Sequence, residues 1–323
     1  MKKQLLAAAV AATMASVAMA DISITGAAKV NYTSTDYDDA STEDKNTVSH
    51  EMDLKVLGKS GDTSVVINFG DIDSTTSGNV DSGMNIEDAY VSTTVMGASL
   101  KAGQWDNGNN ALRASSRVDN KVAVSKEISG VTVTFEAQDE GNGGTNMSDT
   151  IKLATTIGGV NVSYKDTHTG EDITLSTEIA GLNVSYLALN KDAANMDRSV
   201  VEVSGSYNGV DVKVAQANAD SGDAIDGDSW MGDFEGSSVI TTPSAGQDVT
   251  AIELKTSIAG NTVAFRHTDI DGVAGEDTDF QKVIVTRPLA NGTTFEATYT
   301  QLNDDDSVTT DRESLDLELA VKF

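Results

Sequence analysis

Apolar and polar side chains alternate residue by residue along many short segments of this chain. The same segregation runs through residues 22–32, 131–136, 173–179 and 252–258. A period of two predicts β-strands with one apolar and one hydrophilic face. The last segment is the clearest example, with Leu315, Leu317, Leu319, Val321 and Phe323 in one phase and Asp316, Glu318, Ala320 and Lys322 in the other. Because charges avoid the apolar phase, we expect that phase to face lipid.

Short and long connections take turns between these segments. The short ones, at 128–131, 157–160, 179–182, 207–210, 258–261 and 290–293, carry glycine or Asn-Gly, which suits tight hairpins. The long ones, at 34–46, 71–85, 106–118, 138–147, 190–197, 219–247, 269–277 and 302–312, are acidic and rich in glycine. This regularity predicts an all-β fold, a transmembrane antiparallel β-barrel with short periplasmic turns and long extracellular loops.

Counting the hairpins gives 16–18 strands. Two strands of this count are undecided, because the connection at 167–170 is short for an extracellular loop. Barrels of roughly 16–18 strands leave an aqueous channel, whereas barrels of about eight strands fill with side chains. The size therefore favours a pore.

The first residues have the pattern of an export signal. Lys2 and Lys3 precede an apolar stretch over residues 5–17, and Ala18-Met19-Ala20 follows. That stretch is too short for a spanning helix and matches a secretory signal peptide with its cleavage site. We expect residues 1–20 to be a signal peptide and residues 21–323 to be one outer-membrane β-barrel pore. The expected location is the outer membrane of a Gram-negative bacterium.

Charge and composition narrow the chemistry. Setting aside the two signal lysines leaves 20 basic residues against 50 acidic ones, which disfavours nucleic acid as a partner. The chain has no cysteine, so disulfides and thiolate metal sites are excluded. With three histidines and none of the hydrolase, metalloprotease or phosphate-loop motifs, the sequence does not indicate an enzyme.

Two loops are strongly acidic. Asp220, Asp223, Asp226, Asp228 and Asp233 lie in the longest loop, and Asp304, Asp305 and Asp306 in the last. Carboxylates are the ligands that Ca²⁺ prefers, but neither spacing matches a calcium-loop motif. We expect no cofactor and no metal site, with the acidic loops simply solvated. The alternative is that Ca²⁺ bridges the acidic loops.

Four features resemble the Gram-negative general diffusion porins. They are the signal peptide, the first strand at 21–30, the segment Ser-Leu-Lys-Ala-Gly-Gln-Trp-Asp at 99–106, and the terminal strand ending in Phe323. The resemblance implies a barrel commonly of 16 strands, a homotrimer, and contact with outer-membrane lipid and lipopolysaccharide. It also implies that Phe323 is read by the barrel-assembly machinery. By the same resemblance, a third loop folds inward and carries Asp106, Arg113, Arg117 and Asp119 at the pore constriction.

The hydrophilic phase supplies the rest of the expected pore lining. Lys29, Lys55 and Lys101 are expected at the constriction, and the other inward charges are Lys165, Lys213, Lys255, Arg266, Glu51, Asp53, Glu136, Glu178, Glu202, Glu253, Glu296, Asp316 and Glu318. Opposed charges would place a transverse field across the pore. We expect passive diffusion of small hydrophilic solutes and ions with a weak cation preference. The alternative is a substrate-selective outer-membrane channel for a sugar or an anion, and a surface-binding or structural barrel is a third interpretation.

Overall fold

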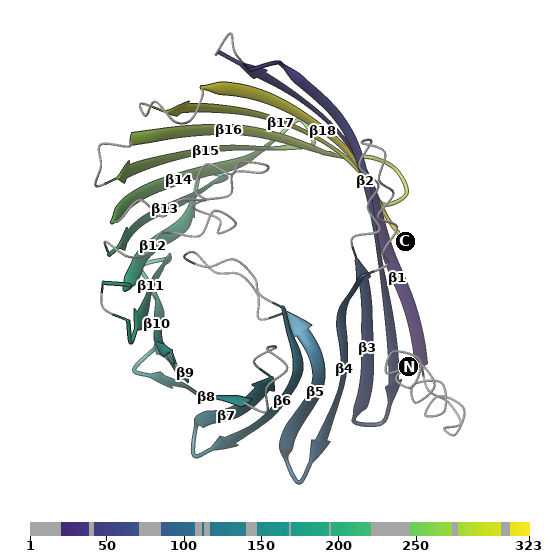
Figure 1. The fold of residues 1–323 in the computed structure, drawn as a ribbon, viewed down its shortest axis with the longest axis vertical. Helices are drawn as coiled ribbons and strands as arrows, with labels where there is room; N and C mark the ends of the chain where they lie inside the picture. The colour runs from purple at the N-terminus through teal and green to yellow at the C-terminus, as the bar shows by residue number, and fades with distance from the viewer. Residues whose placement is uncertain are drawn as a thin grey trace.

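The computed structural model shows a barrel wall formed by β-strands (Figure 1). It describes residues 21–38, 42–70, 85–106, 112, 117–139, 147–167, 169–193, 195–220, 246–272, 277–304 and 311–323. The expected signal peptide at 1–20 lies outside the described residues. Within the described part of the chain, no helix is long and apolar enough to cross a membrane.

The alternating segments form eighteen strands. They are β1 (Asp21–Tyr37), β2 (Lys45–Ser60), β3 (Thr63–Gly70), β4 (Asn85–Val95), β5 (Ala98–Asp106), β6 (Arg117–Ile128), β7 (Val131–Asp139), β8 (Met147–Ile157), β9 (Val160–Thr167), β10 (Gly170–Ile179), β11 (Leu182–Lys191), β12 (Arg198–Tyr207), β13 (Val210–Ala219), β14 (Gln247–Ile258), β15 (Asn261–Gly272), β16 (Asp277–Pro288), β17 (Thr293–Asp304) and β18 (Arg312–Lys322).

Each strand pairs antiparallel with the next along the chain, and β18 pairs with β1, so the sheet closes on itself. The expected antiparallel barrel is confirmed, and its strand number is 18. The two strands left open by the sequence are β9 and β10, which pair directly up to Thr167 and Gly170. Closure removes the free sheet edge that a barrel in lipid could not tolerate.

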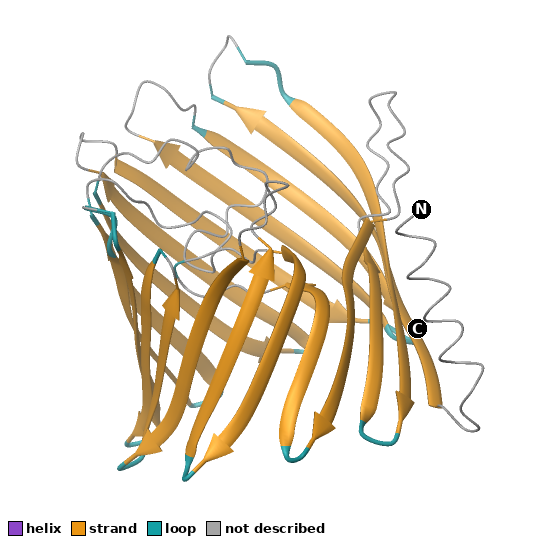
Figure 2. Cartoon of the chain, turned by 60° about the horizontal axis from the view of Figure 1, so that its bottom comes forward, coloured by secondary structure: helices purple, strands orange, loops and turns teal. Residues whose placement is uncertain are grey.

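Tight turns join the strands along one rim of the barrel, drawn in teal at the bottom of Figure 2. In the turn between β12 and β13, Asn208 has a φ of 50° and Gly209 a φ of 79°. Two central residues with positive φ define a type I′ turn, whose twist matches that of the paired strands. The six turns predicted from the sequence are confirmed, and Met96-Gly97 forms another of the same kind.

The apolar phase of the strands faces outward. Ile24 is 62% exposed, Leu319 49% and Phe135 45%, although all three are large and apolar. A closed antiparallel barrel with an exposed apolar surface is the architecture of outer-membrane proteins. We therefore assign the barrel to the outer membrane of a Gram-negative bacterium, as the sequence predicted.

The seam between β1 and β18 ends at a contact between Gly26 and Phe323. The Gly26 amide donates to the Phe323 carbonyl at 2.8 Å, and the Phe323 amide donates to the Gly26 carbonyl at 3.0 Å. The Phe323 ring lies against the glycine, because a Cβ built at Gly26 would come within 2.6 Å of its Cζ. The terminal aromatic residue therefore has a packing role at the seam, while its recognition by assembly machinery stays a prediction.

The assignment of the two barrel faces predicts opposite effects for neighbouring lysine substitutions on β8. Leu153→Lys should lower the free energy of unfolding in lipid vesicles by about 2–4 kcal/mol, since it places a charge on the lipid face. Ala154→Lys, one residue on and facing the lumen, should change it by less than about 0.5 kcal/mol. Denaturant titration of vesicle-inserted protein measures both. Equal effects would contradict the assignment.

The seam predicts that Gly26→Ala slows or prevents barrel closure, because the added methyl meets the Phe323 ring and the Asp53 carbonyl oxygen, 2.9 Å away. Ala28→Val, two residues on in the same phase of β1, is the matched control and should fold. Adding Phe323→Leu to Gly26→Ala should restore part of the folded fraction. Heat-modifiable gel mobility after refolding into detergent reads that fraction. No rescue would show that ring packing does not limit closure.

Candidate functional site

Four lysines form a basic strip on the inner wall of one side of the barrel. They are Lys101 on β5, Lys121 on β6, Lys152 on β8 and Lys165 on β9. Their phase is opposite to that of the outward-facing Val122, which is 40% exposed, and Leu153. Lys152 and Lys165 are direct cross-strand partners. Like charges in that position destabilise a sheet, and violations of such a local rule are expected at functional sites.

Carboxylates partly neutralise the basic strip. Lys152 Nζ lies 2.8 Å from Glu136 Oε1, and Lys165 Nζ lies 3.2 Å from Asp172 Oδ2. Each carboxylate comes from the next strand, on the far side of its lysine from the other lysine. The two ammonium groups are thus held apart by their acidic partners. They remain partly open to solvent, so a passing anion can still approach them.

Two aromatic rings hold the other two lysines. Lys101 Nζ lies 3.8 Å from the Tyr90 ring centroid and 4.3 Å from that of Trp105, and Lys121 Nζ lies 4.4 Å from the Trp105 centroid. The two rings meet edge to face, 6.2 Å apart at 72°. Cation–π contacts of this kind contribute about 0.5–2 kcal/mol each. The Lys121 side chain is fully buried, so it adds positive potential to the strip without touching solutes itself.

A local irregularity of β5 sets the position of the Trp105 ring. Gly103 has a φ of 138°, and a Cβ there would lie 2.1 Å from the Ala89 carbonyl oxygen. The register with β6 shifts between Gly103 and Trp105. Such a bulge re-aims the following side chain. Glycine at 103 therefore permits the bulge that places the Trp105 ring against Lys101 and Lys121.

An acidic pair faces the lumen from the opposite side. Glu296 on β17 and Glu318 on β18 are direct cross-strand partners. Figure 1 shows β17 and β18 across the barrel from β5–β9. The neighbouring Phe295 and Leu319 face outward, 37% and 49% exposed. A basic strip opposed by an acidic pair would place a transverse field across the lumen, and that field stays a prediction.

A third sector of the inner wall is apolar, which corrects the expectation of a hydrophilic lumen throughout. We call it the apolar bed, and it comprises Leu189, Val200, Ala215, Ala217, Ala219, Val249, Ala251, Ile270, Phe280 and Leu302 on β11–β17. Leu112, from the connection between β5 and β6, is fully buried in this cluster. The Arg198 guanidinium Nη1 donates to the Leu112 carbonyl at 2.8 Å. Leu112 therefore lies on the inner wall of β11–β17.

The structure does not gather all the predicted constriction residues. Asp106 ends β5, and its amide donates to Asp88 Oδ1 at 3.1 Å. Arg113 lies outside the described residues, as do the side chains of Arg117 and Asp119, whose backbones belong to β6. Of the three lysines predicted at the constriction, only Lys101 belongs to the basic strip.

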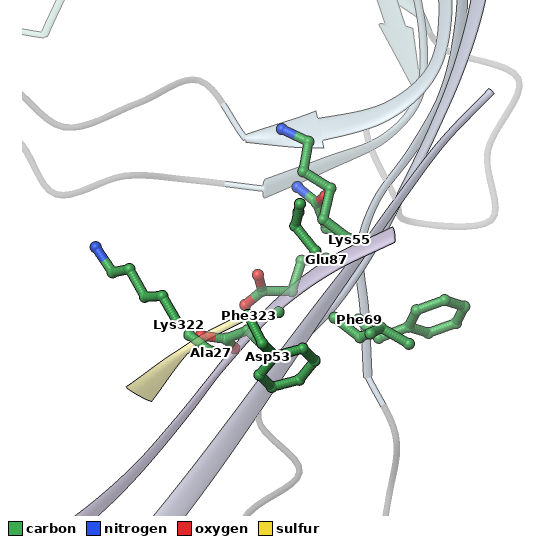
Figure 3. Close-up of a pocket in the computed structure, with 11 residues that line it drawn as sticks. Ala27, Asp53, Lys55, Phe69, Glu87, Lys322 and Phe323 are labelled. Atoms are coloured by element: carbon green, nitrogen blue, oxygen red, sulfur yellow. The ribbon is translucent and has the colours of Figure 1, made fainter. Parts of the chain in front are cut away.

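The other two predicted lysines lie near the barrel seam. Lys29 Nζ is 2.8 Å from Glu51 Oε2 between β1 and β2. Lys55 lines a cavity of about 590 Å³ together with Asp53, Asn68, Glu87 and Phe323. Figure 3 shows Lys55 and Glu87 on one side of the sheet and Phe69 on the other. These two lysines belong to the seam, several strands away from the basic strip.

Lys121, Lys152 and Arg198 were missed as candidates. The signal for the first two was present, because residues 121–125 and 151–153 alternate like the other strands. Nothing in the sequence pairs Arg198 with a residue 86 positions away.

The structure does not test whether the two acidic loops bind Ca²⁺. Apart from Asp220 and the backbone of Asp304, the aspartates named for Ca²⁺ lie outside the described residues. Among the residues that are described, no three His, Asp or Glu side chains are grouped to hold a metal ion.

Comparison with known proteins identifies the fold. No protein-family model matches the sequence, and no curated protein sequence matches it. OccK2 (OpdF) of Pseudomonas aeruginosa superposes with a TM-score of 0.67 at 11% identity, over 94% of this chain and 98% of that one. OccAB4 of Acinetobacter baumannii gives 0.65 at 10%, over 94% and 98%. An anion-selective porin from Comamonas acidovorans gives 0.56 at 11%, over 94% and 100%. The chain has the fold of outer-membrane porins.

The basic strip predicts that Glu136→Gln shifts ion preference towards anions. Removing one unit charge at about 10 Å in water changes the energy of an anion and of a cation by about 0.4 kcal/mol in opposite directions, a factor of about four in the permeability ratio. Glu43→Gln, an exposed acid in the connection before β2, is the matched control and should leave the ratio unchanged. Reversal potentials across a salt gradient measure both variants. An equal shift in both would mean that the strip does not face the ion path.

Proposed function

We propose that this protein is a substrate-selective outer-membrane porin whose water-filled lumen prefers small anionic solutes. The observation that carries the proposal is the basic strip, in which two lysines face each other directly across strands. An arrangement that weakens the sheet is retained where it serves a function. A ladder of ammonium groups along one wall offers successive contacts to an anion.

The charges around the strip suit transport rather than tight capture. Glu136 and Asp172 pair with two of its lysines, so an anion meets a weakly positive wall. Conduction requires binding that is strong enough for entry and weak enough for release. The acidic pair on the opposite side repels the same anion towards the strip. Solutes with a separated positive group would align along this transverse field.

The weak cation preference expected from the sequence rested on acids outnumbering bases, overall and in the lumenal set identified there. That set lacked Lys121 and Lys152, two of the four lysines in the basic strip. The comparisons do not support a cation preference, because a similar structure whose name states its selectivity is an anion-selective porin. They favour the alternative, a substrate-selective channel. Assembly as a homotrimer, insertion by the barrel-assembly machinery and contact with lipopolysaccharide remain predictions from the resemblance.

The acidic pair favours a second candidate function, a passive pore with weak cation preference. Glu296 and Glu318 place two negative charges together on the lumenal wall. If these charges control the narrowest part of the lumen, cations pass more readily than chloride. The sign of the reversal potential separates the two candidates.

The proposal predicts a chloride-to-potassium permeability ratio above one in planar bilayers. Lys101→Met and Lys152→Met, tested separately, should each lower that ratio by about fourfold, because each removes one positive charge from the strip and the change acts on chloride and potassium in opposite directions. Lys45→Met, at the outer end of β2, is the control and should leave the ratio unaltered. A wild-type ratio below one, raised by Glu318→Gln and insensitive to Lys101→Met, would instead establish the passive cation-preferring pore.

A further inference from the structure

We propose that a hydroxyl-lined hollow next to the basic strip binds the uncharged, hydroxylated part of a solute whose negative group is held by Lys152 and Lys165. This defines the solute more closely than its charge does, as a polyhydroxylated anion such as a sugar acid. The inference rests on the proposed function, because the strip supplies the contact for the negative group. The hollow supplies a second contact of different chemistry.

The hollow lies on the inner wall of β6–β10 and has a volume of about 430 Å³. Its central row is formed by Thr132 on β7, Ala154 on β8, Ser163 on β9 and Thr174 on β10. Ala154 is the direct cross-strand partner of both Thr132 and Ser163, and Ser163 is the direct partner of Thr174. Ala154 follows Lys152 by two residues on β8, so the row shares the inward phase of the basic strip. The four side chains therefore face the lumen together.

The small side chain of Ala154 creates space at the centre of this row. Neighbouring strands lie about 4.8 Å apart, so Thr132 and Ser163, on either side of β8, are about 10 Å apart across it. A methyl group leaves that span open, and Ala154 is exposed. The hydroxyl of Thr132 on one side, and those of Ser163 and Thr174 on the other, therefore border a space wide enough for a hydroxylated chain or a sugar ring.

Hydroxyl and amide groups continue the lining towards the tight turns. Thr156, Asn161 and Ser176 lie there, and Thr156 Oγ1 donates to Asn161 Oδ1 at 2.8 Å. A hydroxyl group both donates and accepts hydrogen bonds, and an amide carries two donors beside its acceptor oxygen. Solute hydroxyls have the same double capacity, whereas an alkyl chain forms no hydrogen bonds with such groups. The lining therefore favours a hydroxylated solute over an apolar one of equal size.

The basic strip lies directly beside the hollow. Lys152 comes two residues before Ala154 on β8, and Lys165 two residues after Ser163 on β9. Two residues along a strand span about 7 Å on the same face. The side chains of Lys152 and Lys165 are 35% and 25% exposed although each pairs with a carboxylate. A negative group held by these ammonium groups therefore places the following few carbons of the solute, with their hydroxyls, along the central row.

Glu127 sets the direction in which such a solute lies. It lines the hollow from β6, where it is the direct partner of Thr132, on the side away from Ser163. Its carboxylate repels the negative group of a solute and accepts hydrogen bonds from solute hydroxyls. The negative group is therefore directed to the lysines, and the hydroxylated end to the hollow.

Planar-bilayer recordings of the full-length protein test the proposal with three solutes. Gluconate has a carboxylate followed by a hydroxylated chain, hexanoate has the same chain length and charge without hydroxyls, and glucitol has the hydroxyls without the charge. Each solute is added to a chloride solution, and the concentration that blocks half of the single-channel current is measured. Gluconate should block at a concentration about tenfold lower than either of the others, because it alone contacts both the strip and the hollow.

Variants separate the two contacts. Ser163→Ala and Thr174→Val should each weaken the block by gluconate about fivefold, the effect of one typical hydrogen bond, without changing the block by hexanoate. Ala154→Leu fills the centre of the row and should weaken the gluconate block at least as strongly. Lys152→Met should weaken gluconate and hexanoate alike. Thr294→Val, next to the outward Phe295 on β17 and across the barrel from the strip, is the matched control and should alter neither.

Two results would overturn the proposal. Equal block of the wild type by gluconate and hexanoate, or a gluconate block that none of Ser163→Ala, Thr174→Val and Ala154→Leu weakens, would show that the hollow does not bind solute hydroxyls. Gluconate that blocks no better than glucitol would show that the strip does not hold the negative group. Gel mobility of the unheated protein confirms that each variant barrel is folded.

The outcome is distinguishable from failure of the proposed function, because anion preference is read separately from the reversal potential. An anion-preferring channel that gluconate and hexanoate block equally would keep the proposed function and lose the hollow. A cation-preferring wild type that still binds gluconate about tenfold better than hexanoate, with a loss in Ser163→Ala, would keep the hollow and remove the anion preference.

Discussion

The structure depends on one constraint, that a backbone in lipid must satisfy its own hydrogen bonds. Sheets meet this constraint only by closing, because an open edge would leave amide and carbonyl groups unpaired in hydrocarbon. In this chain β1 pairs with β18 from Ala27–Lys322 to Tyr37–Arg312, and Gly26 and Phe323 continue that ladder with bonds in both directions. The glycine is needed because the terminal ring occupies the space of a side chain.

Closure also creates an inner wall whose residues need not resemble one another. The lipid face is apolar over its middle, since a charge near the bilayer midplane costs about 2–4 kcal/mol. Its charged side chains, such as Lys126 opposite Val133 and Arg287 opposite Phe295, lie near strand ends. The inner face does not contact lipid, so its residues are not required to be apolar. Here it divides into the basic strip on β5–β9, the acidic pair on β17 and β18, and the apolar bed on β11–β17. A pore lined in this way presents a different chemistry to a solute on each side.

Parts of this wall were predictable. The inward phase of Lys101 and Lys165 followed from alternation. Lys121 on β6 and Lys152 on β8 lie in the inward phase of equally alternating segments. The ion pairs that flank the strip follow once neighbouring strands are in register. Their partners could not be named beforehand, because a one-residue slip in register moves every side chain to the other face. The apolar bed escaped notice because Ala215, Ala217 and Ala219 alternate with polar residues as lipid-facing alanines would.

The sequence by itself determined the barrel: period-two alternation, Gly-containing turns at regular spacing and a clean apolar phase. These are local signals, and local geometry is enough to read them. Tertiary structure alone decided that β1 closes on β18 through Phe323, that Lys152 meets Lys165, and that Leu112 lies on β11–β17. Each of these facts joins residues whose separation along the chain carries no periodic signal. The contact of Arg198 with Leu112, 86 residues apart, exists because closing the barrel brings both to one inner wall.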